Sequence, residues 1–132
     1  MPVVLTTARR LAALGLCAAA SLAAFATPPA HAAPAGAVLY ITVTPVSDGA
    51  YSMRLTCDPD GGLHPYPVDA CDAIRSVDGD LFALNYNPGP CPRNYDPVRV
   101  EVRGHWYGQP ISFDEKFSNR CVMERTLGPV TG

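Results

Sequence analysis

Several features that would place this 132-residue chain in a common functional class are missing from its sequence. It contains neither the G-x-S-x-G motif of many serine hydrolases nor the H-E-x-x-H motif of many zinc proteases. The spacings between its cysteines do not match the C-x₂₋₄-C pattern of a zinc site, so we predict no metal and no cofactor. Its basic residues form no stripe, which argues against nucleic-acid binding. Nothing in the sequence therefore indicates an enzyme.

The first 32 residues have the pattern of a secretory signal peptide. A basic pair, Arg9-Arg10, precedes an apolar run of about 16 residues at 11–26, and an Ala-x-Ala pattern ends at Ala32. A membrane anchor is the alternative, but the run is shorter than the roughly 20 apolar residues that span a bilayer. We therefore expect cleavage after Ala32 and secretion of one mature domain, residues 33–132.

The mature domain would keep four of the five cysteines, because Cys17 lies within the apolar run. An even number of cysteines in a small exported domain predicts two disulfides, and four cysteines allow three pairings. The same residues carry eight basic and twelve acidic side chains, so the domain is mildly acidic. The four remaining cysteines are Cys57, Cys71, Cys91 and Cys121.

Two pairs of segments alternate apolar and polar residues, which is the pattern of antiparallel hairpins with one buried face. The first pair is 37–44 and 50–57, with a turn at 47–49, and the second is 98–104 and 111–117, with a turn at 105–110. Between the pairs, apolar residues recur at helical spacing over 68–80, with Asp69 as the N-cap and Gly79 as the stop. The prediction is an α+β fold, an antiparallel sheet with one face covered by a helix.

The histidines, the large aromatics and the tail of the mature chain are predicted to have structural roles only. His64 and His105 are expected at the surface or in turns, because histidine is only intermediate in burial. Trp106 and Tyr107 are interpreted as packing or interface aromatics. The tail, 126–132, is expected to fray, because chain ends are poorly ordered unless contacts hold them.

Residues 89–97, GPCPRNYDP, place three prolines and a cysteine around the pair Arg93-Asn94. Proline fixes φ and a disulfide would anchor Cys91, so the segment is stiff although it has the composition of a loop. A solvated arginine in a proline-rich loop is one interpretation. The other is a protease-binding segment, since a preorganised loop binds without losing conformational entropy. Arg93 would then suit a trypsin-like specificity pocket, whose floor holds an aspartate.

The segment CPRNYDPVRVEVRGHWYG at 91–108, followed by FSNRC at 117–121, resembles the Streptomyces subtilisin inhibitor family. The likeness extends over nearly all the mature chain, through LTC at 55–57, HP at 64–65, AC at 70–71 and GDLFAL at 79–84. It implies a homodimer with an α+β fold, in which about five antiparallel strands carry two short helices on one face. It also implies the disulfides Cys57–Cys71 and Cys91–Cys121.

The resemblance further implies a secreted serine-protease inhibitor that acts on trypsin-like and subtilisin-like proteases. The reactive bond would be Arg93-Asn94, with Arg93 as P1, the residue that enters the specificity pocket, and Asn94 as P1′. Many family members carry Met or Lys at P1, so an arginine points to trypsin-like targets in addition to subtilisins. The rest of the binding loop would be Pro90, Cys91, Pro92, Tyr95, Asp96 and Pro97.

Two residues of the FSNRC motif, Ser118 and Asn119, would support this loop if Cys91 were bridged to Cys121. We hypothesise that the Asn119 side chain hydrogen-bonds the loop backbone and holds the two ends together after cleavage. The segment 122–132 departs from the family, whose members usually end in a further apolar strand, because it is short and contains Pro129. Whether it forms the last strand, and how stable the dimer is, stays open at this point.

A second interpretation is a secreted interaction module that another extracellular enzyme, such as a transglutaminase, uses as a substrate or binding partner. A third is a small hydrolase, for which the sequence offers no motif. Stoichiometric inhibition of trypsin and subtilisin would separate the first interpretation from the second.

Overall fold

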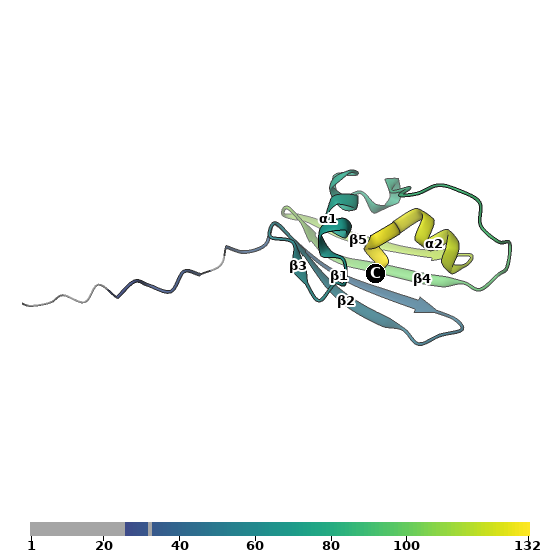
Figure 1. Ribbon diagram of the computed structural model, residues 1–132, viewed down its shortest axis with the longest axis horizontal. Helices are drawn as coiled ribbons and strands as arrows, with labels where there is room; N and C mark the ends of the chain where they lie inside the picture. Colours follow the sequence, from purple (N-terminus) through teal and green to yellow (C-terminus); the bar gives the residue numbers. More distant parts are fainter. Residues whose placement is uncertain (1–25, 32) are drawn as a thin grey trace, which may run out of the picture. The chain divides into compact units, whose positions relative to one another are not determined.

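The computed structural model describes residues 26–31 and 33–132, and the chain divides into two units, Met1–His31 and Ala32–Gly132 (Figure 1). In the first unit, the described residues 26–31 form no helix or strand. The predicted signal peptide and its cleavage site after Ala32 lie almost entirely outside the described residues, so both stay predictions. Within the described ranges, every helix is too short or too polar to cross a bilayer.

Residues 33–132 form a five-stranded antiparallel sheet in the order β3-β2-β1-β4-β5. Its strands are β1 (Ala37–Pro45), β2 (Tyr51–Cys57), β3 (Gly61–Gly62), β4 (Val98–Trp106) and β5 (Gln109–Phe117). The two predicted hairpins are confirmed as β1–β2 and β4–β5, and β1 also pairs with β4 in the middle of the sheet. The fifth strand is the short β3 at the edge, which pairs with the end of β2.

The turn of the second hairpin is shorter than the predicted 105–110. Strand β4 continues to Trp106 and β5 begins at Gln109, so only Tyr107 and Gly108 connect them. Their φ values are 46° and 81°. Positive φ at both central residues is typical of two-residue turns whose twist matches that of the flanking strands. Trp106 is buried, which confirms its packing role, whereas Tyr107 is exposed.

One face of the sheet forms the core of this unit. Successive residues of a strand point to opposite faces, so alternate residues such as Leu39, Ile41 and Val100 are fully buried. Two helices, α1 (Pro67–Arg75) and α2 (Arg120–Leu127), cover this face in the described part of the chain, together with the 3₁₀ segments η1 (Leu81–Ala83) and η2 (Gly128–Thr131) (Figure 1). The predicted α+β architecture is therefore confirmed.

Helix α1 begins and ends earlier than the sequence predicts. Pro67 is the first helical residue, because its fixed φ suits that position and its missing N–H needs no partner there. The predicted N-cap, Asp69, lies instead in the first turn, where its charge interacts favourably with the helix dipole. The helix ends at Arg75, and the predicted stop, Gly79, follows in a turn with a φ of 84°.

The C-terminal tail is folded, so the prediction that residues 126–132 fray is wrong. After α2, the segment η2 packs against α1, and Val130 and Thr131 are buried. The Tyr51 hydroxyl donates a 3.1 Å hydrogen bond to the Thr131 carbonyl. These contacts hold the chain end in place, which removes the usual cause of fraying. Residues 122–132 supply helix rather than a last strand.

His64 lies in the irregular segment between β3 and α1, in keeping with a turn position, but it is buried, with 6% of its surface exposed, and is not a surface residue. Its Nε2 donates a 3.1 Å hydrogen bond to the Val130 carbonyl, and its Nδ1 accepts one of 3.1 Å from the Tyr66 N–H. A carbonyl can only accept and an N–H can only donate, so the ring is held in its neutral form. Burial lowers the pKa of His64 in agreement with this. His105 is exposed, as predicted.

The disulfide Cys57–Cys71 joins β2 to α1 and confirms the predicted pairing. Both cysteines are fully buried, so the bridge lies within the core. Among the described residues, Asp60 and these two sulfur atoms form a group with the spacing of metal ligands, all within 4.8 Å. The sulfurs are bonded to each other, however, so they offer no thiolate to a metal ion.

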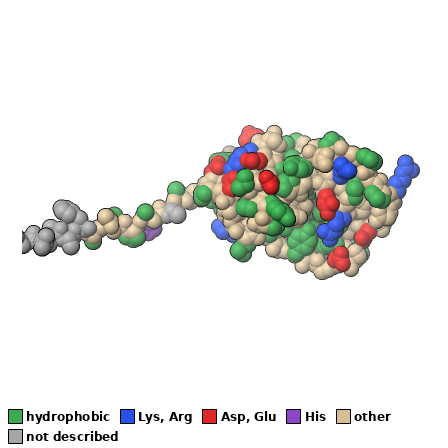
Figure 2. All heavy atoms as spheres, viewed as in Figure 1, with side chains coloured by type: hydrophobic (Ala, Val, Ile, Leu, Met, Phe, Trp, Pro, Cys, Tyr) green, Lys and Arg blue, Asp and Glu red, His purple; other side chains and the backbone are tan. Residues whose placement is uncertain are grey.

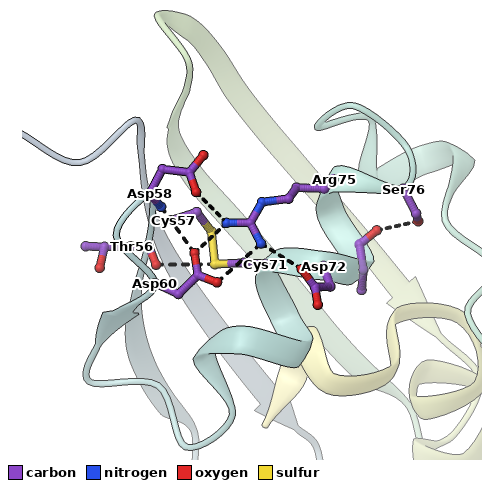
Figure 3. Close-up of polar contacts among 9 residues, drawn as sticks. Thr56, Cys57, Asp58, Asp60, Cys71, Asp72, Arg75 and Ser76 are labelled. Atoms are coloured by element: carbon purple, nitrogen blue, oxygen red, sulfur yellow. Dashed lines mark hydrogen bonds and ion pairs between the residues drawn. A yellow bond between two sulfur atoms is a disulfide. The ribbon is translucent and has the colours of Figure 1, made fainter.

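An ion-pair network surrounds this disulfide. The Arg75 guanidinium pairs with the carboxylates of Asp58, Asp60 and Asp72 (Figure 3), and Figure 2 shows acidic and basic side chains close together over this part of the molecule. The hydrogen bond from Arg75 lowers the pKa of Asp60, and the same bond raises the pKa of Arg75. When Arg75 and its carboxylate partners are ionised, the network therefore links α1 to the loop that follows β2.

Candidate functional site

The proline-rich segment 84–97 connects η1 to β4 without helix or strand and extends along one end of the sheet (Figure 1). Arg93 and Asn94 are exposed, and Tyr95 is 72% exposed. Asp96 and Pro97 are half-buried where the loop returns to β4. Figure 2 shows a basic side chain projecting from this end of the molecule. The loop thus presents the pair Arg93-Asn94 to solvent.

The second disulfide, Cys91–Cys121, fastens the loop to helix α2 and confirms the other predicted pairing. Its Cα atoms are 5.8 Å apart, and both cysteines are half-buried. Cys91 stands two residues before Arg93, and Pro92 between them has a fixed φ. The backbone is therefore restrained immediately before the exposed pair.

Asn119 restrains the backbone on both sides of the Arg93-Asn94 bond. Its side-chain Nδ2 donates hydrogen bonds of 2.9 Å to the Pro92 carbonyl and 3.0 Å to the Asn94 carbonyl. Its Oδ1 accepts a 3.0 Å hydrogen bond from the Val122 N–H, so Asn119 is also the N-cap of α2. The cap fixes the orientation of the amide, which is 3% exposed. The backbone contact hypothesised for Asn119 is present, and its effect on cleavage stays a prediction.

The carboxyl-terminal side of the loop is attached to different elements. The Asp96 N–H donates a 3.0 Å hydrogen bond to the Ser118 carbonyl, so Ser118 contributes its backbone. The Ser47 hydroxyl donates to the Asp96 carboxylate at 3.1 Å, and the Val46 N–H donates to the Pro97 carbonyl at 3.1 Å. The turn between β1 and β2 thus holds this side of the loop. Strand β5 adds a cation–π contact, because the Lys116 Nζ lies 5.7 Å from the centre of the Tyr95 ring.

The sequence predicts the loop but not all of the residues that support it. The loop itself and its cysteines could be identified from the proline and cysteine pattern. Val46, Ser47 and Lys116 were not, because they are about 20 to 50 positions away in the chain and carry no motif of their own. Only their position at the same end of the sheet brings them to the loop.

This site is an exposed, fixed backbone segment and has the properties of a ligand rather than of a binding cleft. Its restraints act on backbone groups at residues 92, 94, 96 and 97, and they leave the Arg93 side chain exposed. Such a segment can enter the groove of another protein with little loss of conformational entropy.

Comparison with known proteins supports this interpretation. Residues 35–119 match the family model described as subtilisin inhibitor-like. Subtilisin inhibitor-like protein 5 of Streptomyces fradiae is 38% identical over 91 residues, which are 67% of this chain and 81% of that protein. The trypsin inhibitor STI2 of Streptomyces longisporus is 37% identical over 121 residues, which are 85% of this chain and 84% of that protein.

A solved structure has the same fold. Sermetstatin of Streptomyces caespitosus, crystallised in complex with subtilisin of Bacillus licheniformis, is 32% identical and superposes with a TM-score of 0.56, covering 71% of this chain and 96% of sermetstatin. The two Streptomyces relatives described above are named as inhibitors or inhibitor-like proteins. The chain belongs to the subtilisin inhibitor-like family.

Proposed function

We propose that this protein is a secreted serine-protease inhibitor that presents the Arg93-Asn94 bond as a substrate-like bait. The main support is the pair of hydrogen bonds from Asn119 to the carbonyls of residues 92 and 94, which flank that bond. A protease would meet this backbone already fixed and exposed, so little entropy is lost on binding.

The same restraints would make cleavage unproductive. After hydrolysis of the bond, the amino-terminal fragment would stay attached to α2 through Cys91–Cys121. The carboxyl-terminal fragment would stay attached through Asp96 and Pro97. Because neither new end can diffuse away, resynthesis of the bond competes with release of the product.

Arg93 and the names of the relatives indicate two classes of target. A guanidinium at P1 complements the aspartate on the floor of a trypsin-like pocket. A relative that is 37% identical is named a trypsin inhibitor, and the solved neighbour was crystallised with subtilisin. We therefore expect both trypsin and subtilisin to be inhibited.

A titration of each protease with purified protein, followed by the variant Arg93→Met, tests this function. We expect stoichiometric inhibition by the wild type. The variant should lose trypsin affinity by about a hundredfold or more, because the buried aspartate of trypsin is left without its partner. Subtilisin affinity should change much less. Arg103→Met, at an exposed position of β4, is the matched control and should leave both affinities unchanged.

Failure of the wild type to silence either protease would reject the inhibitory function, and an equal loss against both proteases in Arg93→Met would reject Arg93 as P1. Homodimerisation and secretion belong to the same proposal. Light scattering of the purified protein and amino-terminal sequencing of the exported form test them.

A further inference from the structure

The amino-terminal arm of the loop, residues 86–92, is held by the last turn of α2. The Tyr86 N–H donates a 3.1 Å hydrogen bond to the Thr126 carbonyl, and the Asn87 N–H donates one of 2.9 Å to the Arg125 carbonyl. The Arg125 Nη1 in turn donates a 3.3 Å hydrogen bond to the Asn87 carbonyl. Arg125 therefore binds Asn87 through both its backbone and its side chain.

The Arg125 guanidinium also lies against the backbone of Gly89. A Cβ atom added to Gly89 would be 2.7 Å from Nη1, 2.9 Å from Cζ and 3.4 Å from Nε. Real Cβ atoms essentially never approach other atoms more closely than 3.0 Å, so a side chain at residue 89 and the present position of Arg125 exclude each other. Gly89 has no φ in the left-handed region. A side chain at residue 89 would therefore displace the guanidinium from the loop backbone.

The composition of this arm explains why the side chain of Arg125 is needed to fix its conformation. Pro88 and Pro90 have no N–H, so the arm cannot be fixed by a regular series of backbone hydrogen bonds. Its next covalent restraint is Cys91, four residues after Asn87. The half-buried Arg125 contacts the arm between these two points. An arginine suits this place because its planar group can donate a hydrogen bond and lie flat on a peptide at once.

We propose that Arg125 is a positioning residue that fixes the arm at P5 and P7, Gly89 and Asn87, and so keeps the reactive bond resistant to hydrolysis. This role rests on the proposed inhibitory function. With Arg125 in place, the arm that precedes Arg93 has one conformation before cleavage and keeps it afterwards. Without it, the prolines leave a stiff segment that pivots at Asn87, and the new end at residue 93 is less well placed for resynthesis.

A double-mutant cycle on Arg125 and Gly89 tests this role. We expect Arg125→Ala to raise the rate at which subtilisin cleaves the loop by about five- to tenfold, the value of one hydrogen bond with its packing. Gly89→Ala should have the same effect, because its Cβ displaces the guanidinium. The double variant should be no worse than either single one, since both remove the same contact. Additive effects would overturn the proposal.

Two further variants separate positioning from general stability. Arg125→Lys keeps the positive charge but not the planar guanidinium. It should therefore recover less than half of the resistance to cleavage that Arg125→Ala loses. Glu124→Ala removes the exposed charged side chain next to Arg125 in α2 and should leave the cleavage rate unchanged. If Arg125→Ala lowers the melting temperature but not the resistance to cleavage, Arg125 is merely structural and the proposal fails.

A measurement without protease keeps this result independent of the proposed function. Amide hydrogen exchange at Tyr86 and Asn87, whose N–H groups donate to the carbonyls of residues 126 and 125, should be about fivefold faster in free Arg125→Ala than in the wild type. Unchanged exchange at both amides would overturn the role of Arg125 even if the protein inhibits proteases. Faster exchange in a protein that inhibits neither trypsin nor subtilisin would support the contact and reject only the inhibitory function.

Discussion

The two disulfides fasten a helix to the rest of the domain at opposite ends of the sheet, but they differ in what they hold. Cys57–Cys71 joins two regular elements, β2 and α1, and is fully buried. Cys91–Cys121 joins α2 to a loop that has no regular structure and whose next residues are exposed. The two cysteines of the first bridge are 14 positions apart in the chain, and those of the second bridge are 30 positions apart.

The surroundings of the two bridges differ in the same way. Beside the first, Arg75 pairs with three carboxylates, one in α1 and two in the loop that follows β2, so these charged groups neutralise one another. Beside the second, Asn119 and Arg125 donate to backbone carbonyls of the loop and leave the Arg93 side chain exposed. At the end with the first bridge, polar side chains therefore stabilise the fold. At the end with the second bridge, they hold the loop backbone in a conformation that the loop would not keep without them.

Removal of each disulfide in turn should give the largest difference between the two ends of the molecule. We expect Cys57→Ser/Cys71→Ser to lower the free energy of unfolding by about 3 kcal/mol, through loss of chain restraint, without changing the rate of loop cleavage in the folded protein. Cys91→Ser/Cys121→Ser should be destabilised to a similar extent, but its loop should also be cleaved about a hundredfold faster, which corresponds to the same free energy. Urea titration and mass spectrometry of cleavage at Arg93-Asn94 give the two quantities. Equal cleavage rates in both variants would show that the ends are not specialised.

Asn119 variants should separate helix stability from loop protection, because this side chain both caps α2 and supports the loop. Asn119→Asp keeps the oxygen that accepts from the Val122 N–H but loses the two donors to the loop. Aspartate is as good an N-cap as asparagine, but its second oxygen would face the carbonyls of residues 92 and 94 with no proton to donate. The loop should therefore separate from α2 at some cost in stability, and cleavage should become at least about tenfold faster. Asn119→Ala should show the same fast cleavage and lose about 1 kcal/mol of stability as well. If Asn119→Asp resists cleavage as well as the wild type, the hydrogen bonds to residues 92 and 94 do not protect the bond.

Much of this arrangement could be predicted from the sequence, and the rest could not for physical reasons. Alternation identifies the hairpins because each strand has one buried face, and the proline and cysteine pattern identifies the loop. The burial of His64 could not be predicted, because it depends on the Val130 carbonyl, 66 positions away. The strand Gly61–Gly62 has no side chains and thus no periodicity. Arg125 looks like any charged helix residue until the fold places Gly89 against it.

Replacement of Arg75 should change stability only slightly. Arg75 lies beside the first disulfide, as Arg125 lies beside the second. Arg75→Gln should lower stability at pH 7 by at most about 1 kcal/mol, since the network is partly exposed and ion pairs of this kind contribute little. The loss should depend on pH. Because Arg75 lowers the pKa of Asp60 below its ordinary 3.8, the ionised pair stabilises the fold above that pH, and this contribution disappears as the pH falls through the lowered pKa.

The wild type and Arg75→Gln should therefore converge in stability as the solution is acidified from about pH 5 towards pH 2, as measured by urea titration at each pH. At neutral pH the variant should inhibit subtilisin like the wild type, because Arg75 lies at the end of the sheet opposite to the loop. Weakened inhibition in Arg75→Gln, with the fold intact, would mean that the two ends are coupled through the core. A difference in stability that stayed constant with pH would mean that Arg75 acts by packing its side chain rather than by its charge.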